Sequence, residues 1–300
     1  MLEDNQPLFS GAASEIITPF TETGQVDLAA LSNEIAFLIS KGITGLFING
    51  LASEALMMSD QDRVLAAKTI IDTNANQVPI MGNIIRNSTA EALKDVEAYA
   101  SLGANAIAIT PPLIYKFTEG GLFDYFNSIA SASPLPVYIY NAPETGNKLS
   151  PKLVAKLFVS NEAFFGYKDS TQNIIELQTL LSLIPSGRRF ELMAGSDAQI
   201  STTMMLGGLG VISLITVVFP ELIVELVDAC KRKDWGYATE LQFKVLKVRE
   251  ALKTGPFMSA YKFVSAELGR PLGCMKQSLS EVNDKEKEAI KSQLADLNML

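Results

Sequence analysis

Lys168 is the residue of this sequence best suited to covalent chemistry. It closes the aromatic, otherwise uncharged run FFGYK at residues 164–168, whose length and composition indicate a β-strand. Alternation along that strand would put Phe164 and Gly166 on the face of Lys168, where the glycine leaves open space. A lysine beside apolar surface is poorly hydrated as an ammonium ion, so its pKa falls and the neutral amine can attack a carbonyl group to form a Schiff base. The competing interpretation is a lysine at a strand end that extends into solvent.

Tyr140 offers the hydroxyl group that such chemistry needs. A Schiff-base cycle moves protons while the carbinolamine loses water and while a carbon-carbon bond breaks. Tyr140 lies near the end of the apolar run at residues 137–141 (VYIYN), which directly precedes the strand of Lys168. Neighbouring strands stand about 4.8 Å apart, so we expect the tyrosine hydroxyl to reach the lysine nitrogen. The alternative is an aromatic core residue with an internally bonded hydroxyl.

A loop of small residues follows the predicted strand at residues 45–49. Its consecutive backbone N–H groups could hold a substrate carboxylate, although an ordinary tight turn has the same composition. The predicted contacts in this loop are Gly50, Leu51, Ala52 and Ser53.

Glycines mark two further loops at predicted strand ends, where the backbone must approach a ligand or turn sharply. One is Gly195, and the other is the glycine-rich stretch at residues 207–210, which is followed by the candidate substrate contact Ile212. Arg86, after the third predicted strand, is a further candidate for a carboxylate contact, although exposed arginines usually only face water.

The absence of histidine excludes whole classes of mechanism. The 300 residues include no histidine, so Ser-His-Asp and Cys-His catalysis and histidine-bound metal sites are excluded. Acidic residues do not gather into a set that indicates a carboxylate-only magnesium site. Covalent amine chemistry, with tyrosine and serine as proton carriers, is compatible with this composition.

Charge and cysteine content restrict the partners and the compartment. A net charge of −8 and a pI near 4.8 argue against a nucleic-acid partner and against an anionic membrane surface. Two cysteines, Cys230 and Cys274, are too few for a disulfide scaffold and fit a reducing cytoplasm. The first ten residues lack a basic start and a long apolar run, so no signal peptide is predicted, and no apolar run reaches membrane-spanning length.

Strand-like and helix-like segments alternate through the first 230 residues. Each short apolar run is followed by a segment with helical periodicity, and serines at positions 59, 88 and 150 are predicted to cap helices, with capping boxes Ser59–Asp62 and Ser88–Glu91. The predicted strands are residues 12–19, 45–49, 78–82, 106–110, 137–141, 164–169, 190–194 and 210–213.

Eight strand-helix units favour a closed (β/α)8 TIM barrel in residues 1–230. The runner-up is a doubly wound open sheet, which is disfavoured because no dinucleotide glycine motif follows the first strand. Residues 231–300 predict about three helices and no strand, so we expect a helical extension packed on the barrel. In such barrels the catalytic groups lie at the C-terminal ends of the strands, where Lys168 and Tyr140 are expected.

Two segments resemble motifs of one enzyme family. Residues 140–143 (YNAP) resemble the motif Y-N-x-P, and residues 166–170 (GYKDS) resemble G-x-K-[DE]-[ST], both of the dihydrodipicolinate synthase / N-acetylneuraminate lyase family of class I pyruvate aldolases. Supporting matches are residues 50–54, 110–112 and 207–213, and the resemblance extends from residue 11 to about residue 273.

The resemblance implies a function and an assembly. It implies Lys168 as the Schiff-base former, Tyr140 as the proton shuttle, a small 2-oxo acid as substrate and no metal or organic cofactor. It also implies a (β/α)8 barrel with C-terminal helices and a homotetramer built as a dimer of dimers.

The sequence departs from the family pattern at residues that would contact the substrate. The family loop commonly carries two hydroxyl residues where this chain has Leu51 and Ala52, and Ser53 replaces a glycine, so backbone N–H groups, helped by the Ser53 hydroxyl, would have to hold a carboxylate. Glu144 stands near the position of an arginine that dihydrodipicolinate synthases share, and Leu113 near that of an aromatic hydroxyl, which disfavours this synthase activity.

The departures favour a lyase or dehydratase that acts on a 2-keto-3-deoxy sugar acid, with pyruvate and an aldehyde as the products of cleavage. Sialic acid lyases share an acidic pair of which Asp197 matches one member while Ala198 removes the other, and Ser170 and Asp197 are candidate contacts to substrate hydroxyls. The alternatives are a condensation of pyruvate with an aldehyde, a non-catalytic family member that binds 2-oxo acids, and a purely structural barrel.

Overall fold

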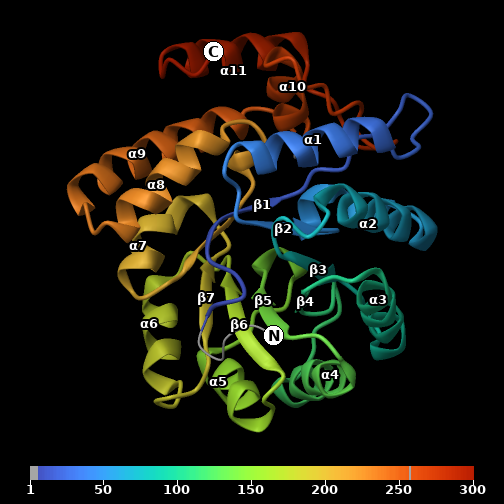
Figure 1. Cartoon of the computed structure of the whole chain (residues 1–300), viewed down its shortest axis with the longest axis vertical. Helices are drawn as coiled ribbons and strands as arrows, with labels where there is room; N and C mark the ends of the chain where they lie inside the picture. Colours follow the sequence, from blue (N-terminus) through green and yellow to red (C-terminus); the bar gives the residue numbers. More distant parts are fainter. Residues whose placement is uncertain (1–5, 257) are drawn as a thin grey trace.

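The protein folds into a closed barrel of eight parallel strands, as the sequence predicts. A computed structural model describes residues 6–256 and 258–300 (Figure 1). Each strand pairs with the next in the chain, and β8 pairs with β1, which closes the barrel. The strands are β1 (Gly11–Glu15), β2 (Gly45–Ile48), β3 (Ile80–Ile84), β4 (Ala106–Ile109), β5 (Val137–Asn141), β6 (Phe164–Asp169), β7 (Glu191–Ala194) and β8 (Gly210–Ser213).

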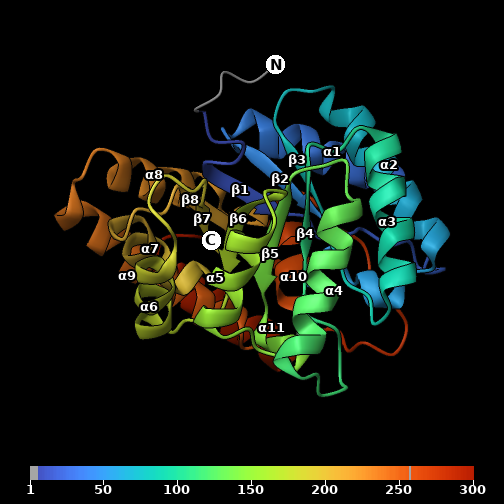
Figure 2. The same cartoon turned by 90° about the horizontal axis from the view of Figure 1, so that it is seen from below.

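Helices follow the strands and surround the barrel (Figures 1 and 2). They are α1 (Leu28–Ser40), α2 (Asp60–Asn74), α3 (Thr89–Leu102), α4 (Glu119–Ala132), α5 (Pro151–Ser160), α6 (Ile174–Leu183), α7 (Ile200–Met205) and α8 (Pro220–Lys231). Short 3-10 turns lie in the connections after strands, at η1 (Leu51–Ser53), η2 (Ala55–Met57), η3 (Pro143–Thr145), η4 (Asp197–Gln199) and η5 (Ile215–Val217). No helix in the described ranges is long and apolar enough to cross a membrane.

Two predicted strands differ from the structure by two or more residues at an end, and the others agree to within one residue. The first strand, predicted to continue to residue 19, ends at Glu15, and Phe20 instead makes isolated bridges with Val26 and Gly273. Pro19 has no N–H group to donate to a neighbouring strand, so the prediction should have ended before it. The third strand is shifted two residues toward the C-terminus and begins at Ile80.

The predicted caps form, but only partly as capping boxes. The hydroxyls of Ser59, Ser88 and Ser150 accept hydrogen bonds from the backbone N–H groups three residues further along. The reciprocal bond expected from Glu91 is replaced by an ion pair with Lys94 at 2.8 Å. The Glu91 side chain could bond either to the backbone N–H of Ser88 or to the amine of Lys94, and in the structure it pairs with Lys94.

Buried apolar side chains form two layers, one on each face of the strands. The larger layer joins strands to helices and includes Phe164 and Tyr167 of β6. The smaller layer consists mainly of strand residues and contains no residue of the surrounding helices, so it fills the inside of the barrel. Its buried members are Phe9, Ala13, Phe47, Met81, Ala106, Ala108, Tyr138, Tyr140, Ala142, Met193 and Ile212.

The strand of Lys168 does not alternate as predicted. Phe164 packs in the outer layer, whereas Phe165 packs against the inner one, because the pairing of β5 with β6 shifts register beside Val137. A bulge of this kind adds one residue and reverses the faces before it. Gly166 leaves no open space either, since a Cβ there would overlap the Tyr138 ring and lie 2.6 Å from the Glu191 carbonyl oxygen.

Three helices follow α8 on one side of the barrel, at the top of Figure 1. They are α9 (Trp235–Leu252), α10 (Ser259–Glu267) and α11 (Asp284–Ala295). Helix α9 packs on α8 and on η4, and α10 contacts η5, so the predicted packing of this segment on the barrel is present. The proposed division of the chain after residue 230 stays a prediction.

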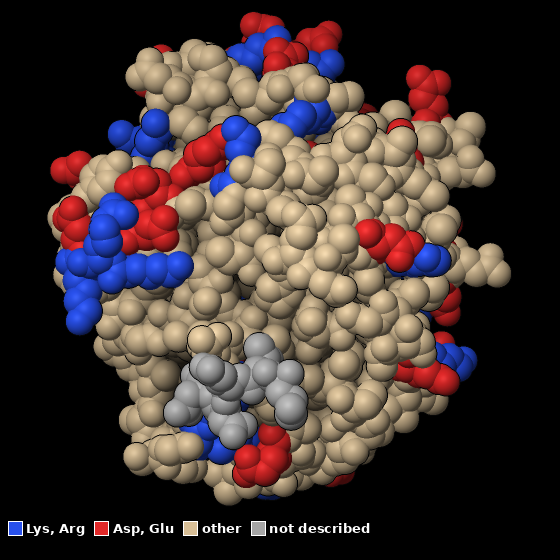
Figure 3. All heavy atoms as spheres, viewed as in Figure 1, with Lys and Arg blue, Asp and Glu red and all other residues tan. Residues whose placement is uncertain are grey.

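Charged side chains of both signs surround the face drawn in Figure 3, and its centre carries few of them. On this face Lys and Arg lie beside Asp and Glu. A mixed rim of this kind produces no strong field of a single sign.

Replacing Gly166 by alanine tests the close packing inside the barrel. We expect the free energy of unfolding to fall by about 1–3 kcal/mol or more, because the new methyl group overlaps a buried ring that cannot move freely. The measurement is denaturant unfolding of the folded variant. The matched control is Gly120→Ala in α4, where a Cβ meets no atom closer than 3.9 Å. This substitution should raise the free energy of unfolding by roughly 0.5–1 kcal/mol, because alanine loses less backbone entropy than glycine on folding. Equal stability of G166A and the parent would contradict this packing.

Candidate active site

Lys168 lies inside the barrel, fully buried, near the C-terminal end of β6. Its Nζ atom lies between two aromatic rings, 3.8 Å from the centroid of Phe47 and 3.9 Å from that of Tyr140. The Nζ atom also donates a hydrogen bond to Oε2 of Glu15 at 2.9 Å and forms an ion pair with it. The predicted lysine is therefore an interior group and does not extend into solvent.

Burial changes the protonation of Lys168. Loss of hydration lowers the pKa of Lys168 below its usual range, and the negative charge of Glu15 opposes that effect. The more distant carboxylates of Glu144 and Asp197 oppose it as well. The amine therefore loses its proton at a lower pH than an exposed lysine does, which is the property that a nucleophilic lysine requires.

Tyr140 is paired with Lys168 as predicted, but its ring rather than its hydroxyl meets the amine. The two residues are register partners of β5 and β6. Among the described residues, the hydrogen-bond acceptor of Nζ is Glu15, and the tyrosine contributes its ring face. Burial raises the pKa of Tyr140 well above its usual range, and the negative charge of Glu15 raises it further. The hydroxyl thus stays protonated and can act as a proton donor.

Glu15 is the residue of this site that the sequence analysis missed. It ends β1, is 7% exposed, and connects two elements, since Oε1 accepts a hydrogen bond of 3.2 Å from the backbone N–H of Ala52 while Oε2 accepts from Lys168. A signal was present in the sequence. An acidic residue inside the apolar run at residues 11–20, two positions after the inward-facing Ala13, must be buried and needs partners.

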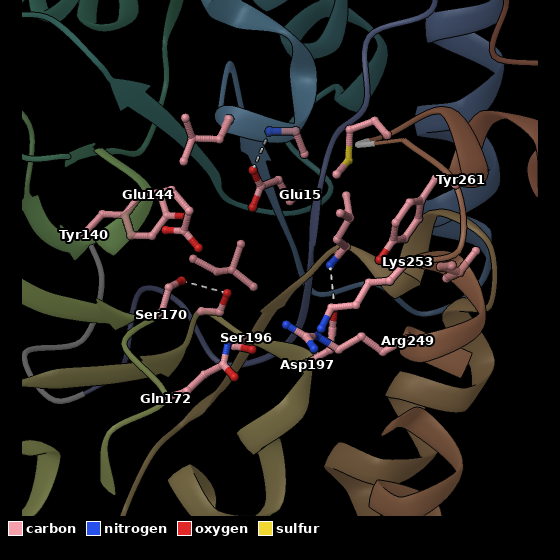
Figure 4. Close-up of a pocket in the computed structure, with 18 residues that line it drawn as sticks. Glu15, Tyr140, Glu144, Ser170, Gln172, Ser196, Asp197, Arg249, Lys253 and Tyr261 are labelled. Carbon is pink, nitrogen blue, oxygen red and sulfur yellow. Dashed lines mark hydrogen bonds between the residues drawn. The ribbon is translucent and has the colours of Figure 1, made fainter. Parts of the chain in front are cut away.

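A cavity of about 470 Å³ opens above the ion pair of Lys168 and Glu15, at the C-terminal ends of the strands (Figure 4). Glu15 and Tyr140 line its floor, while Lys168 lies beneath them and is not exposed to it. The structure brings six of the predicted contacts to its wall, namely Leu51, Ala52, Tyr140, Ser170, Asp197 and Ile212.

Two predicted contacts serve the turn instead of the cavity. Gly50 and Ser53 are absent from the lining, and both the backbone N–H and the hydroxyl of Ser53 donate to the carbonyl oxygen of Gly50, the latter at 2.7 Å. The prediction that the Ser53 hydroxyl helps to hold a substrate carboxylate is therefore not supported by its position. Gly50 is needed because a Cβ there would overlap the Glu15 carboxylate.

Ser170 and Asp197 line the cavity but are already engaged with the protein. The Ser170 hydroxyl donates to the carbonyl oxygen of Gly195 at 2.9 Å. The Asp197 carboxylate accepts hydrogen bonds from the Ser213 hydroxyl and from the backbone N–H groups of Leu214, at 3.2 Å, and Ile215, at 3.3 Å. Both carboxylate oxygens of Asp197 are therefore engaged in holding the turn after β8.

The C-terminal helices complete the cavity, which the sequence analysis did not foresee. Arg249 of α9 and Lys253, which directly follows this helix, line it, as do Met258 and Tyr261 of the following segment (Figure 4). Gln242 of α9 donates to the carbonyl oxygen of Asp197 at 2.8 Å and so ties this helix to the wall. These residues follow the last strand by many positions, so strand-end reasoning could not find them.

Arg86 is not a substrate contact. Its guanidinium donates to Asp95 at 2.8 Å and to Asp60 at 2.8 Å, and it does not line the cavity. Ion pairs with two carboxylates satisfy most of its donors. In the described part of the chain, no three His, Cys, Asp or Glu side chains come together as a metal site would require.

Known proteins match this chain over nearly its whole length. The sequence matches the family model described as "Dihydrodipicolinate synthetase family" over residues 8–297. It is 30% identical to a 4-hydroxy-tetrahydrodipicolinate synthase of Thermoanaerobacter sp., over 98% of each chain. It is 32% identical to a probable 2-dehydro-3-deoxy-D-pentonate aldolase of Escherichia coli, over 88% of this chain and 89% of the relative.

A solved structure agrees with these matches. The crystal structure of YagE, a protein of the dihydrodipicolinic acid synthase family from Escherichia coli in complex with pyruvate, superposes with a TM-score of 0.93. It is 27% identical and the match covers 98% of this chain and 100% of that chain. With a family match over residues 8–297 and relatives aligned from end to end, the chain belongs to the dihydrodipicolinate synthetase family of lyases and synthases.

Proposed function

We propose that this protein is a class I lyase in which the amine of Lys168 forms a Schiff base with the carbonyl group of a small substrate. The observation that carries the proposal is an amine buried inside the barrel, with a lowered pKa, in contact with Glu15 and Tyr140, which line the cavity. A neutral amine is the nucleophile in this chemistry, and burial makes that form accessible at a lower pH than for an exposed lysine.

The Schiff base serves as an electron sink. Once the carbonyl carbon is bonded to Nζ as a protonated imine, electrons from a broken carbon-carbon bond can move toward the nitrogen, and the same intermediate allows loss of a hydroxyl group. Tyr140 stays protonated because of burial and lies over the amine, so it is our candidate for the proton donor. Carbon-carbon cleavage and dehydration share this intermediate.

The substrate class predicted from the sequence is a 2-keto-3-deoxy sugar acid. Two relatives support an oxo acid by their names, one as a probable 2-dehydro-3-deoxy-D-pentonate aldolase and the other as a complex with pyruvate. Glu15, which lies against the reacting amine, opposes a carboxylate at that point. Assembly into a homotetramer and a location in the cytoplasm stay predictions from the sequence.

Borohydride reduction in the presence of carbonyl compounds tests the Schiff base. We expect a stable adduct on Lys168, heavier by the carbonyl compound minus one oxygen atom, and its loss in Lys168→Met. Peptide mass spectrometry locates the adduct, and Lys68→Met, on the exposed face of α2, is the control. Lys262 is an internal comparison, because burial lowers its pKa also but it lies outside the cavity lining. An adduct on Lys262 in place of Lys168 would refute the assignment.

Tyr140→Phe separates the hydroxyl from the ring. The variant keeps the ring that covers Nζ, so we expect the protein to fold and Lys168 to remain trappable. Turnover of a cleaved substrate should fall by roughly 10²- to 10⁴-fold, because the proton transfer loses its donor. Steady-state kinetics and trapping are measured on the same preparation. Unchanged turnover would assign the proton transfer to another group.

The pH dependence of trapping reports the protonation of Lys168. Because burial lowers its pKa, the trapping rate should rise with pH and level off with a midpoint below the value of about 10.4 expected for an exposed lysine. Glu15, Glu144 and Asp197 all shift that midpoint upward, and burial must exceed their combined effect. Rates measured by mass spectrometry at graded pH check this. A midpoint at or above that of a free lysine would contradict it.

A further inference from the structure

Glu15 brings a carboxylate into contact with the reacting amine. It is 7% exposed, and its two oxygens have different partners, the backbone N–H of Ala52 at 3.2 Å and Nζ of Lys168 at 2.9 Å. Ala52 belongs to the loop whose N–H groups the sequence suggested for a substrate carboxylate. In the structure the protein's own carboxylate accepts from that loop.

The same place would be needed by the carboxylate of a 2-oxo acid. When the carbonyl carbon is bonded to Nζ, a carboxylate attached to it has its carbon roughly 2.5 Å from Nζ, by ordinary bond lengths and angles. Oε2 of Glu15 already lies 2.9 Å from Nζ. The rings of Phe47 and Tyr140, whose centroids are 3.8 and 3.9 Å from Nζ, restrict the remaining approaches.

The charges around Lys168 also disfavour a substrate carboxylate at this place. Lys168 contributes one positive charge beneath the floor of the cavity, and Glu15 pairs with it. The other cations of the lining, Arg249 of α9 and Lys253 at its C-terminal end, lie on a different wall. A substrate carboxylate beside Glu15 would be a second negative charge against one cation in a buried site, where like charges repel strongly.

We propose that Glu15 determines the substrate class by filling the place of a substrate carboxylate, so that the site takes a ketone or aldehyde with no carboxylate next to its carbonyl group. This inference rests on the proposed Schiff base at Lys168. It replaces the 2-keto-3-deoxy sugar acid predicted from the sequence, because such an acid has its carboxylate next to its carbonyl group. Carboxylates further along the substrate are not excluded by this contact.

The covalent step balances with Glu15 as the proton carrier. Glu15 takes a proton from the ammonium group, and the freed lone pair of Nζ attacks the carbonyl carbon while the carbon-oxygen π electrons move to oxygen. That oxygen receives the proton held by Glu15, and Glu15 takes a second proton from nitrogen, which gives the neutral carbinolamine. The nitrogen lone pair then expels the hydroxyl group, which leaves as water with the proton returned by Glu15. The product is a protonated imine beside an ionised Glu15, so one cation again faces one anion.

Hydroxyacetone and pyruvate form the matched pair for the test, since a hydroxymethyl group in one replaces the carboxylate in the other. Rates of adduct formation at Lys168 are measured with each compound under borohydride reduction and divided by the rates of a simple alkyl amine, which corrects for intrinsic reactivity. We expect the corrected pyruvate-to-hydroxyacetone ratio of the native protein to lie well below one. Glu15→Ala should raise that ratio by roughly 10- to 100-fold, because the repelling charge is gone.

Two further variants separate charge from shape. Glu15→Gln retains the length of the side chain without its charge and should raise the ratio in the same direction as E15A. Glu144→Gln removes a carboxylate that lines the cavity without bonding to Nζ or to Ala52, and it should change the ratio less. If the Glu15 variants fail to fold, the corrected ratio of the native protein decides alone.

The outcomes for the two proposals differ. A corrected ratio at or above one in the native protein, or a ratio that E15A leaves unchanged, would overturn the role of Glu15 while the Schiff base stands. Absence of a Lys168 adduct with both compounds, in the native protein and in E15A alike, would overturn the proposed function itself.

Discussion

The buried ion pair between Lys168 and Glu15 is the constraint on which the site depends. An ammonium ion enclosed by Phe47 and Tyr140 would be severely destabilised without a counter-charge, and Glu15 supplies it across the barrel from another strand. The pair balances two opposing requirements. Burial moves the amine toward its neutral form, and the negative charge of Glu15 opposes that shift by stabilising the ammonium form.

A second buried pair extends this arrangement to the C-terminal helices. Lys262 of α10 lies 2.8 Å from Glu54, which follows the loop of Ala52, and Glu54 also accepts from the backbone N–H of Lys276 at 2.7 Å. Breaking a buried pair by removing one partner leaves an uncompensated charge. The loop that contacts Glu15 is thus held from both sides, by the barrel and by the last part of the chain.

The architecture and the pairing of Tyr140 with Lys168 could be predicted because their signals are local. Eight apolar runs with intervening helical periodicity predict a barrel, and the strands of Tyr140 and Lys168 follow each other directly in the chain. The role of Glu15 could not be read in the same way, since its partner is 153 positions away. A register shift reversed the faces near Phe164, and no residue type in the sequence indicates such a shift. The α9 residues reach the cavity only through tertiary packing.

Completion of the cavity by Arg249, Met258 and Tyr261 also bears on the order of events during synthesis. All eight strands are made before α9 and the segment of Tyr261 leave the ribosome, so the barrel can close while one wall of the cavity is still missing. Water then reaches the floor from the open side, and Glu54 still lacks Lys262. The wall of the cavity is complete only once the C-terminal segment has docked, so the nascent barrel acquires its shape before its cavity is enclosed.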